Sequence, residues 1–339
     1  MGSFWSGDHS LDYNILNMNV LVYGWYHHQN LGDDLFMDAF KALFPNFNFN
    51  FVNQITSYNL QGIDAVFIGG GSLLGEVISV SDNETYDLLK QQRIFYIGVG
   101  AETDINVFHA ELMARAELIA LRSAVGLDKV LEINTNTIII NDLVYYLQPT
   151  KTIEPLIKSV LVLPNISVVP NWNEPHWKHV AWEYFKTEFA QFLDNLINEG
   201  YLLNFLPLCT DSSLDDNLAT AEIISRMVSR NHRYFLPKEN TFSSITETMS
   251  RYSLIITQRY HGIVLAEMVN VPCLSIVHHN KLKRSQGHEL SFYGITKDKI
   301  KEQFDQLIHA EMTQFLPIDR DMFIQLHRRV MNALCGHQK

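Results

Sequence analysis

Short apolar runs alternate with amphipathic segments along most of the chain. The runs are rich in β-branched residues and have the length of buried parallel strands, whereas the longer segments carry apolar residues at helical i, i+3, i+4 spacing. Strands are expected at residues 19–23, 64–68, 93–100, 118–121, 137–140, 160–163, 202–206, 253–257 and in a run ending at 276. Helices are expected at about residues 35–43, 87–92, 108–116, 182–200, 218–229, 242–251, 302–312 and 321–334.

This alternation predicts an α/β protein with two Rossmann-like domains that face each other across a cleft. A chain of 339 residues is too long for one ordinary core and suits two domains. Residues 151–157, flanked and interrupted by Pro149 and Pro155, form the expected linker. The domains are therefore expected at residues 1–150 and 151–339.

Residues 253–276 form the clearest βαβ unit of the sequence. Its first strand is followed by a loop that contains Arg259, Tyr260 and His261, and a helix is expected to begin at Gly262. Ligands of α/β proteins collect at the carboxyl ends of strands, where helix N-termini favour anions. Arg259 and His261 are therefore candidates to hold an anion, although an arginine paired with a carboxylate and an ordinary loop histidine would give the same pattern.

Two loops of the first half lie at equivalent strand ends. Residues 24–34 lead into a helix that we expect Asp33 or Asp34 to cap. Residues 69–71 are consecutive glycines, which allow a close approach of backbone N–H groups to an anion. They do not form GxGxxG, and no acidic residue follows at the dinucleotide spacing, which argues against a nicotinamide enzyme.

Arg122 follows the strand at residues 118–121, so it could join the same anion site or be an ordinary solvated residue. In the second half, residues 207–216 form a loop before a helix that Asp215 or Asp216 should cap. A polar, basic loop that includes Lys281 follows the last strand of the βαβ unit.

The composition of the chain excludes some classes of binding partner and indicates where the protein is located. With 26 basic and 37 acidic residues the net charge is −11, and no basic stripe appears, so a nucleic acid is not expected as a partner. The three cysteines, Cys209, Cys273 and Cys335, show no CxxC spacing, which suggests reduced thiols and a cytoplasmic protein. No apolar run is long enough to span a bilayer, and the N-terminus lacks the features of a signal peptide.

No metal site is expected. The histidine pairs His27-His28 and His278-His279 are adjacent in sequence and lack the i, i+4 or two-His-one-carboxylate spacing of metal ligands.

The ordered set of motifs resembles the polysaccharide pyruvyl transferase family over about residues 20–294. The resemblance rests on Gly24-Trp-Tyr with Asn30 and Gly32-Asp33-Asp34, Gly69 to Leu74, Arg122-Ser123, the 207–216 loop, Arg259-Tyr-His261-Gly262 and Lys281. It implies a fold similar to GT-B glycosyltransferases. It also implies transfer of pyruvate from phosphoenolpyruvate to two hydroxyls of a sugar, which forms a ketal.

The resemblance implies three catalytic residues, His261, Arg259 and Arg122. Substrate-binding residues would be Asn30, Asp33, Gly70, Gly71, Ser72, Tyr260, Lys281 and His28. The chemistry of the donor agrees, since two arginine forks suit its phosphate and carboxylate and a histidine can protonate the leaving phosphate. The general base stays open between Asp33 and His28, and phosphoenolpyruvate is a co-substrate, so no cofactor is expected.

The resemblance implies a sugar or glycan acceptor, which could stack on Trp25, Tyr26, Trp172 or Trp177 and could be presented by a lipid at the membrane surface. Departures from the family pattern concern the acceptor most. His27 stands where glycine is commoner, Tyr260 replaces Leu, Met or Phe, and Cys209 replaces a common histidine. Two other functions remain open, namely a GT-B-type nucleotide-sugar glycosyltransferase and a non-catalytic sugar-binding protein.

Overall fold

The computed structural model contains two parallel-sheet α/β domains, as the sequence predicts. It describes residues 17–149, 153, 155–234, 241–279, 282, 288–309 and 319–336. The first part of the chain forms β1 (Met18–Tyr23), α1 (Leu31–Leu43), β2 (Phe47–Val52), β3 (Ala65–Gly71), α2 (Asn83–Lys90), β4 (Ile94–Val99), α3 (Val107–Met113), β5 (Leu118–Leu121), α4 (Leu127–Ile133), β6 (Thr137–Ile139) and the 3-10 helix η1 (Leu143–Tyr146).

The second part begins with β7 (Ser159–Leu163) and the 3-10 helix η2 (Ile166–Val168). It continues with α5 (His176–Asn198), β8 (Leu202–Phe205), α6 (Asp216–Arg226), β9 (His232–Tyr234), α7 (Phe242–Ser250), β10 (Leu254–Thr257), α8 (Tyr260–Met268), β11 (Cys273–Val277), β12 (Glu289–Ser291), α9 (Lys297–His309) and α10 (Asp321–Gly336).

Each sheet has one point where the strand order reverses. The first sheet runs β2-β1-β3-β4-β5-β6, so its reversal lies between β1 and β3. The second sheet runs β12-β11-β10-β7-β8-β9 and reverses between β7 and β10. The connections leave in opposite directions at such a point and open a crevice at the carboxyl ends of the strands, where open α/β sheets bind ligands.

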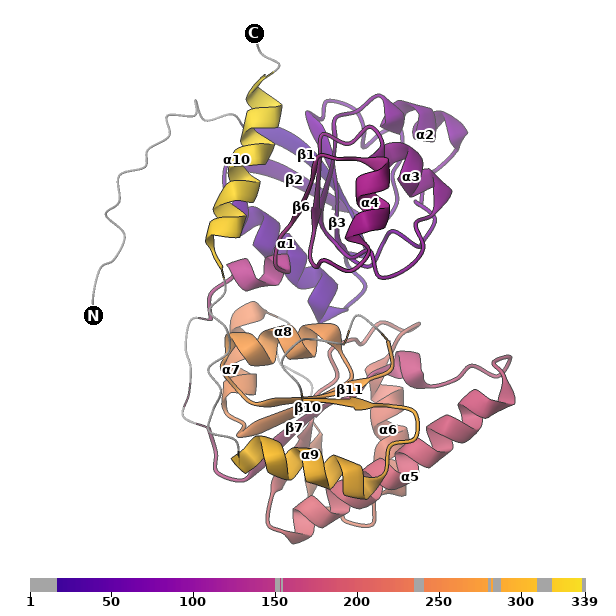
Figure 1. The fold of residues 1–339 in the computed structure, drawn as a ribbon, viewed down its shortest axis with the longest axis vertical. Helices are drawn as coiled ribbons and strands as arrows, with labels where there is room; N and C mark the ends of the chain where they lie inside the picture. The colour runs from indigo at the N-terminus through magenta and orange to yellow at the C-terminus, as the bar shows by residue number, and fades with distance from the viewer. Residues whose placement is uncertain are drawn as a thin grey trace, which may run out of the picture.

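The two domains share one apolar core. Helices α2, α3 and α4 cover one face of the first sheet, and α5, α6 and α9 cover the outer face of the second (Figure 1). A continuous buried cluster joins the remaining faces, including Phe36 and Phe40 of α1, Leu163 of β7 and Val264 of α8. Burial of each such side chain contributes about 1.5–3 kcal/mol, so this shared core holds the facing strand ends together.

Helix α10 returns to the first domain, where Figure 1 shows it beside the first sheet. Its Phe323, Leu326 and Val330 belong to the shared core, and Arg93 before β4 donates to the Leu334 carbonyl at 3.0 Å. We therefore propose that the first domain consists of the chain to about residue 150 together with α10, and not of the N-terminal half alone.

Helix α1 begins at Leu31, four residues before the predicted start. The N-cap residue is Asn30, which makes no side-chain capping bond, so the prediction of an aspartate cap is wrong. The reason lies in the other domain, because the Leu31 N–H donates to the carbonyl of Leu208 at 2.9 Å. A tertiary partner thus takes the place of the cap.

Other helices also begin earlier in the chain than predicted. Helix α8 begins at Tyr260 and not at Gly262, so His261 lies in its first turn, and α5 begins at His176 and not at residue 182. Helix α6 is capped by Asp215, whose Oδ1 accepts from the Asn217 N–H at 2.9 Å, as predicted. Strands β2, β9 and β12 were not predicted.

Candidate active site

The predicted site residues come from the reversal points of both sheets and meet between the domains. The loop after β1 and the glycines of β3 lie on one side, and the segments after β7 and β10 lie on the other. Direct contact joins the two sides, because a β-carbon added to Gly32 of α1 would lie 1.9 Å from Nδ1 of His261. The strand ends of the two domains therefore build one site.

Arg259 forms a buried ion pair at the start of α8. Its Nε lies 3.0 Å from Oδ2 of Asp216, and its Nη2 bonds the other carboxylate oxygen. Asp216 also accepts the N–H groups of Ile166 and Cys209, both at 2.9 Å. Burial raises the pKa of Asp216 above its ordinary value, although Arg259 opposes this shift. Arg259 is thus held in one orientation, with its Nη1 unbonded among the described residues and its side chain 14% exposed.

His261 is enclosed by the first domain. Its ring lies edge to face with that of Phe36, with centroids 5.5 Å apart, and Nδ1 lies against the backbone of Gly32. Its Nε2 is 3.7 Å from Oδ2 of Asp142, which follows β6. This is an ion-pair distance and too long for a hydrogen bond, and neither buried atom has a hydrogen-bond partner among the described residues.

Asp142 is the principal site residue that the sequence did not assign. It is fully buried, and its Oδ1 accepts from the Val144 N–H at 3.0 Å. Burial alone would raise its pKa, but His261, Arg122 and the Val144 amide outweigh burial and lower the pKa below its ordinary value. Its position directly after a predicted strand was the available signal, since Arg122 was selected on the same ground.

Arg122 is not a solvated residue. Its side chain is 2% exposed and donates to Glu102 through Nε at 3.2 Å and Nη2 at 2.9 Å, and to Ser72 Oγ at 2.7 Å. Its guanidinium lies 4.5 Å from the centre of the Tyr260 ring, and its Nη1 lies 3.8 Å from Asp142. Burial lowers its pKa, but Tyr260, Glu102 and Asp142 together raise it above its ordinary value. Arg122 therefore links β3, β5 and α8 from within the protein.

The glycines of β3 let α1 approach the strand. Gly70 and Gly71 have φ of +78° and +86°, and a β-carbon at Gly70 would lie 2.7 Å from the ring of Phe36. A β-carbon at Gly71 would lie 3.1 Å from Oδ1 of Asp33. Asp33 in turn accepts from Nδ2 of Asn30 at 2.6 Å. These residues are therefore packed together at the β1–β3 crevice.

His28 and its neighbours fasten the domains to each other, and we call residues 27–31 with 208–211 the interdomain clamp. His28 Nδ1 lies 3.4 Å from Asp211, and its ring stacks on Trp25 at 3.9 Å. Asn30 forms an antiparallel β-bridge with Cys209. The clamp thus occupies the His28 ring in contacts across the domain boundary.

The other residues and features considered in the sequence have different outcomes. Tyr26 is fully buried and donates to the Gly69 carbonyl at 2.5 Å, so the prediction that its face could stack on a sugar is wrong. Lys281 lies outside the described residues. Among the residues that the structure describes, no group of three His, Cys, Asp or Glu side chains could hold a metal ion. No helix in that part of the chain is both long and apolar enough to cross a membrane.

Comparison with known proteins adds a family and a fold. A family model described as polysaccharide pyruvyl transferase matches residues 30–280. A comparison with curated proteins gives no match. Similar solved structures include UDP-GlcNAc 2-epimerase from Methanocaldococcus jannaschii in complex with UDP-GlcNAc and UDP, with a TM-score of 0.60 and 8% identity over 93% of this chain and 99% of that one.

Two further structures have the same arrangement. UDP-GlcNAc 2-epimerase from Neisseria meningitidis bound to UDP-GlcNAc has a TM-score of 0.55 and 13% identity over 93% of this chain and all of the other. HepE from Anabaena in complex with UDP-glucose has a TM-score of 0.50 and 10% identity over 94% and 100%. At these identities the likeness concerns the fold, which is GT-B-like.

Proposed function

The chain belongs to the polysaccharide pyruvyl transferase family, and on that premise we propose that it transfers pyruvate from phosphoenolpyruvate to two hydroxyls of a sugar in a glycan or its precursor. The products are a cyclic ketal and inorganic phosphate. The observation that carries the proposal is the pairing of His261 with buried Asp142 across the domain boundary, next to the fixed guanidinium of Arg259.

The donor is assigned to the start of α8. No side chain caps this helix, so its first turn offers N–H groups and a partial positive charge to an anion. Arg259 adds the Nη1 donors that Asp216 leaves unused. Arg122 is already bonded to Glu102 and Ser72, so we assign it to holding Tyr260 and Asp142 and not to direct contact with the donor.

The reaction balances with acid and base catalysis alone. A sugar hydroxyl oxygen bonds to C2 of phosphoenolpyruvate while C3 gains a proton, and the hydroxyl proton passes to a base. The second hydroxyl oxygen then bonds to C2 as the C2–O bond to phosphate breaks, and its proton leaves with the phosphate. Two protons are lost from the sugar, one reaching C3 and one the phosphate, so the transfer needs no oxidant or reductant.

We assign His261 as the acid that protonates the leaving phosphate. Asp142 is ionised because its pKa is lowered. Its carboxylate lies 3.7 Å from Nε2 of His261, the ring nitrogen that has no hydrogen-bond partner among the described residues and that we assign as the proton donor. Of the two base candidates, Asp33 is the better placed, since it neighbours Gly32 against the His261 ring, while His28 is engaged in the interdomain clamp.

The test is phosphate release from phosphoenolpyruvate, measured with nucleotide-linked and lipid-linked galactose, mannose and N-acetylmannosamine. Acceptor-dependent release that falls at least about a hundredfold in His261→Ala and Arg259→Lys supports the proposal. Arg251→Lys is the matched control, because Arg251 pairs with Glu247 on the exposed side of α7 and its loss should not affect turnover.

The same assay separates the alternatives. Release of UDP from a UDP-sugar, without phosphate release from phosphoenolpyruvate, would instead support a nucleotide-sugar glycosyltransferase. Sugar binding with neither release would support a non-catalytic protein.

A further inference from the structure

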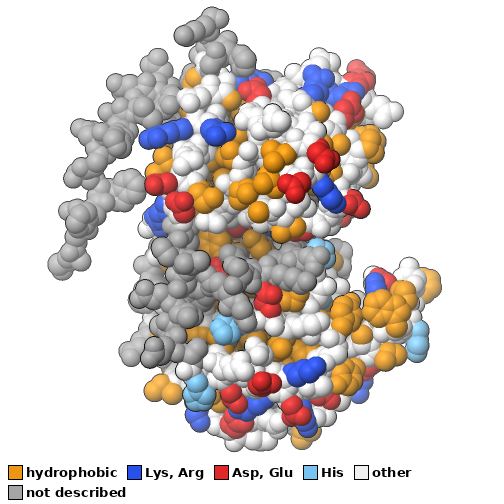
Figure 2. All heavy atoms as spheres, in the orientation of Figure 1, with side chains coloured by type: hydrophobic (Ala, Val, Ile, Leu, Met, Phe, Trp, Pro, Cys, Tyr) orange, Lys and Arg blue, Asp and Glu red, His pale blue; other side chains and the backbone are white. Residues whose placement is uncertain are grey.

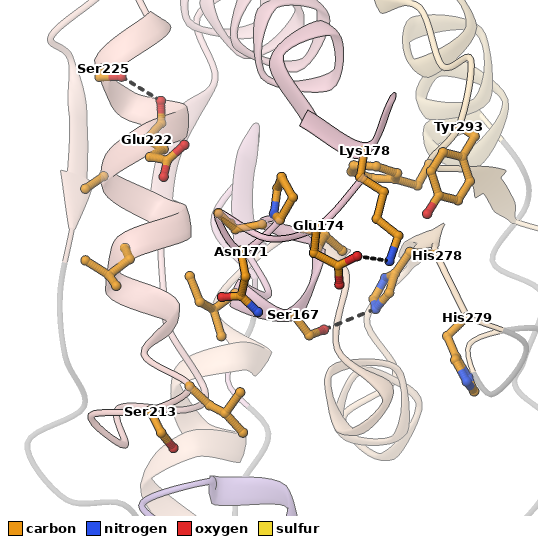
Figure 3. A pocket seen from close by; sticks show the side chains of 18 residues that line it. Ser167, Asn171, Glu174, Lys178, Ser213, Glu222, Ser225, His278, His279 and Tyr293 are labelled. Atoms are coloured by element: carbon orange, nitrogen blue, oxygen red, sulfur yellow. Dashed lines mark hydrogen bonds and ion pairs between the residues drawn. The ribbon is translucent and has the colours of Figure 1, made fainter. Parts of the chain in front are cut away.

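A cavity lies in the second domain, at the edge where β7, β11 and β12 end (Figure 3). Its volume is about 960 Å³, at the upper end of the range of roughly 300–1,000 Å³ typical of ligand pockets. The walls come from the segment after β7, the start of α5, the outer part of α6 and the residues after β11 and β12. The cavity therefore occupies a second part of the crevice at the carboxyl edge of this sheet.

Its lining is rich in groups that bond hydroxyls. Asn171 and Ser213 are exposed and line the cavity, and Glu222 is held with Oε2 2.7 Å from both Trp182 Nε1 and Lys186 Nζ. Figure 3 shows Tyr293 on the opposite wall from the helix that carries Glu222. Amide, hydroxyl and carboxylate groups with an aromatic ring are the groups that a sugar can use.

Cationic groups are scarce among the same lining residues. Lys178 is the one lysine or arginine there, and its Nζ is bonded to Glu174 at 2.7 Å (Figure 3). Two carboxylates also line the cavity, Glu174 beside Lys178 and Glu222 on the opposite wall (Figure 3). A diphosphate would have to displace Glu174 from Lys178 and lie near Glu222, which disfavours a highly charged anion.

Exposed aromatic side chains extend the cavity outward. Trp172 is 92% exposed and Trp177 is 56% exposed, and the Trp177 ring lies 5.8 Å from that of Tyr293 on the cavity wall. Figure 2 shows hydrophobic side chains gathered on the projecting part of the second domain, where α5 begins in Figure 1. Exposed apolar side chains grouped beside a cavity mark a binding surface.

A short path joins this cavity to the candidate active site. Ile166 lines the cavity, and its N–H donates to Asp216 at 2.9 Å. The same carboxylate holds Arg259. A chain molecule in the cavity would therefore lie next to the donor site, with one wall in common.

We propose that this cavity binds neutral sugar residues of the acceptor that flank the sugar to be modified, with Tyr293 and Trp177 as the stacking surface. Only the identification of the bound glycan as the acceptor rests on the proposed pyruvyl transfer. The binding itself requires no donor, and the substrate class it names is an extended neutral glycan rather than a single nucleotide-linked sugar.

The test uses binding without phosphoenolpyruvate. The full chain is screened on an array of neutral oligosaccharides from monosaccharides to hexasaccharides, and hits are measured by titration calorimetry together with UDP and pyrophosphate. We expect affinity to rise with chain length. Tyr293→Ala should bind about three- to tenfold more weakly, and Asn171→Ala should also weaken binding. Tyr58→Ala, which removes another exposed tyrosine in the first domain, is the matched control.

The two proposals fail separately. His261→Ala should retain glycan binding while it loses phosphate release. In the wild-type protein, glycan binding without phosphate release contradicts the proposed reaction and leaves the cavity proposal standing. Absence of neutral glycan binding across the array overturns the cavity proposal. So does binding of UDP or pyrophosphate that Tyr293→Ala abolishes, which would assign the cavity to a nucleotide.

Discussion

At the scale of single residues, the site depends on close approach between helix α1 and the His261 ring. Gly32 has no side chain, and any β-carbon there would overlap Nδ1 of that ring. Glycine is therefore required at this position by a contact from the other domain, and not by the backbone angles of a helix. The sequence showed Gly32 as part of a motif but could not show what it accommodates.

Gly32→Ala should lower the free energy of unfolding by roughly 1–3 kcal/mol, because an added methyl group must displace the His261 ring. A double-mutant cycle with His261→Ala, followed by urea unfolding, identifies the cause. The cost should largely disappear when the ring is absent. An equal cost with and without the ring would show that Gly32 is needed for another reason.

Asp142→Asn should lower kcat by about 10² to 10⁴ while leaving the KM for phosphoenolpyruvate nearly unchanged. The carboxylate lies 3.7 Å from Nε2 of His261, so its loss removes a buried negative charge beside the proposed acid. A role in folding alone would lower the fraction of folded enzyme, read from its unfolding transition, and leave kcat per folded molecule unchanged. Asp104→Asn, at an exposed carboxylate paired with Lys129, is the matched control.

At the scale of elements, the interdomain clamp contains backbone that most residues avoid. His27 and Gln29 have φ of +65° and +50°, in the left-handed region. Side chains other than glycine cost about 1–2 kcal/mol there. Such a backbone favours glycine, the residue that the resemblance to the family gives as commoner at the position of His27. The two halves of the clamp pair through this backbone, because the Thr210 N–H donates to the Gln29 carbonyl at 3.0 Å.

His27→Gly should raise the free energy of unfolding by about 0.5–1 kcal/mol, and His27→Val should lower it by roughly 1–3 kcal/mol. Thermal unfolding of the two variants measures the difference. The control is His179→Gly within α5, where glycine should instead cost about 1 kcal/mol. A loss of stability in His27→Gly would mean that the side chain has a stabilising contact that outweighs the strain.

The strands that the sequence failed to predict share one property. Strands β2, β9 and β12 are all edge strands, and β2 is mostly half-buried, with apolar and polar residues alternating over most of its length. Central strands such as β10 are buried on both faces and so appear as apolar runs. An edge strand pairs with one neighbour and needs no continuous apolar run, so a search for such runs misses these three strands, although it finds the apolar edge strand β6.

The positions of several site residues could be predicted from the sequence, but their partners could not. Arg259, His261, Arg122 and Asp33 follow strands or begin helices, so their place at one edge of a sheet can be predicted from local pattern. Their partners cannot, because Asp216 and Glu102 meet the arginines only through tertiary structure. Arg259 therefore satisfies both interpretations of the sequence, because it pairs with a carboxylate, Asp216, and also lies in the candidate site.

At the scale of the whole molecule, helix α10 crosses from the end of the chain to the first domain. Its apolar face is buried in the core that both domains share, and Arg93 bonds the Leu334 carbonyl near its C-terminal end. The two domains are therefore connected twice, by the segment between β6 and β7 and by the return of α10. This arrangement predicts that unfolding of α10 will affect the first domain before it affects the outer face of the second.

Phe323→Ala should lower the free energy of unfolding by about 3–5 kcal/mol, since its ring is fully buried in the shared core and contacts Tyr146 of η1. Ile324→Ala, one residue later and 41% exposed, is the matched control and should change it by no more than about 0.5 kcal/mol. Hydrogen exchange then shows where the loss acts. Faster exchange in β4 and β5 with β8 unchanged is expected if α10 belongs to the first domain, whereas faster exchange confined to the second sheet would contradict that assignment.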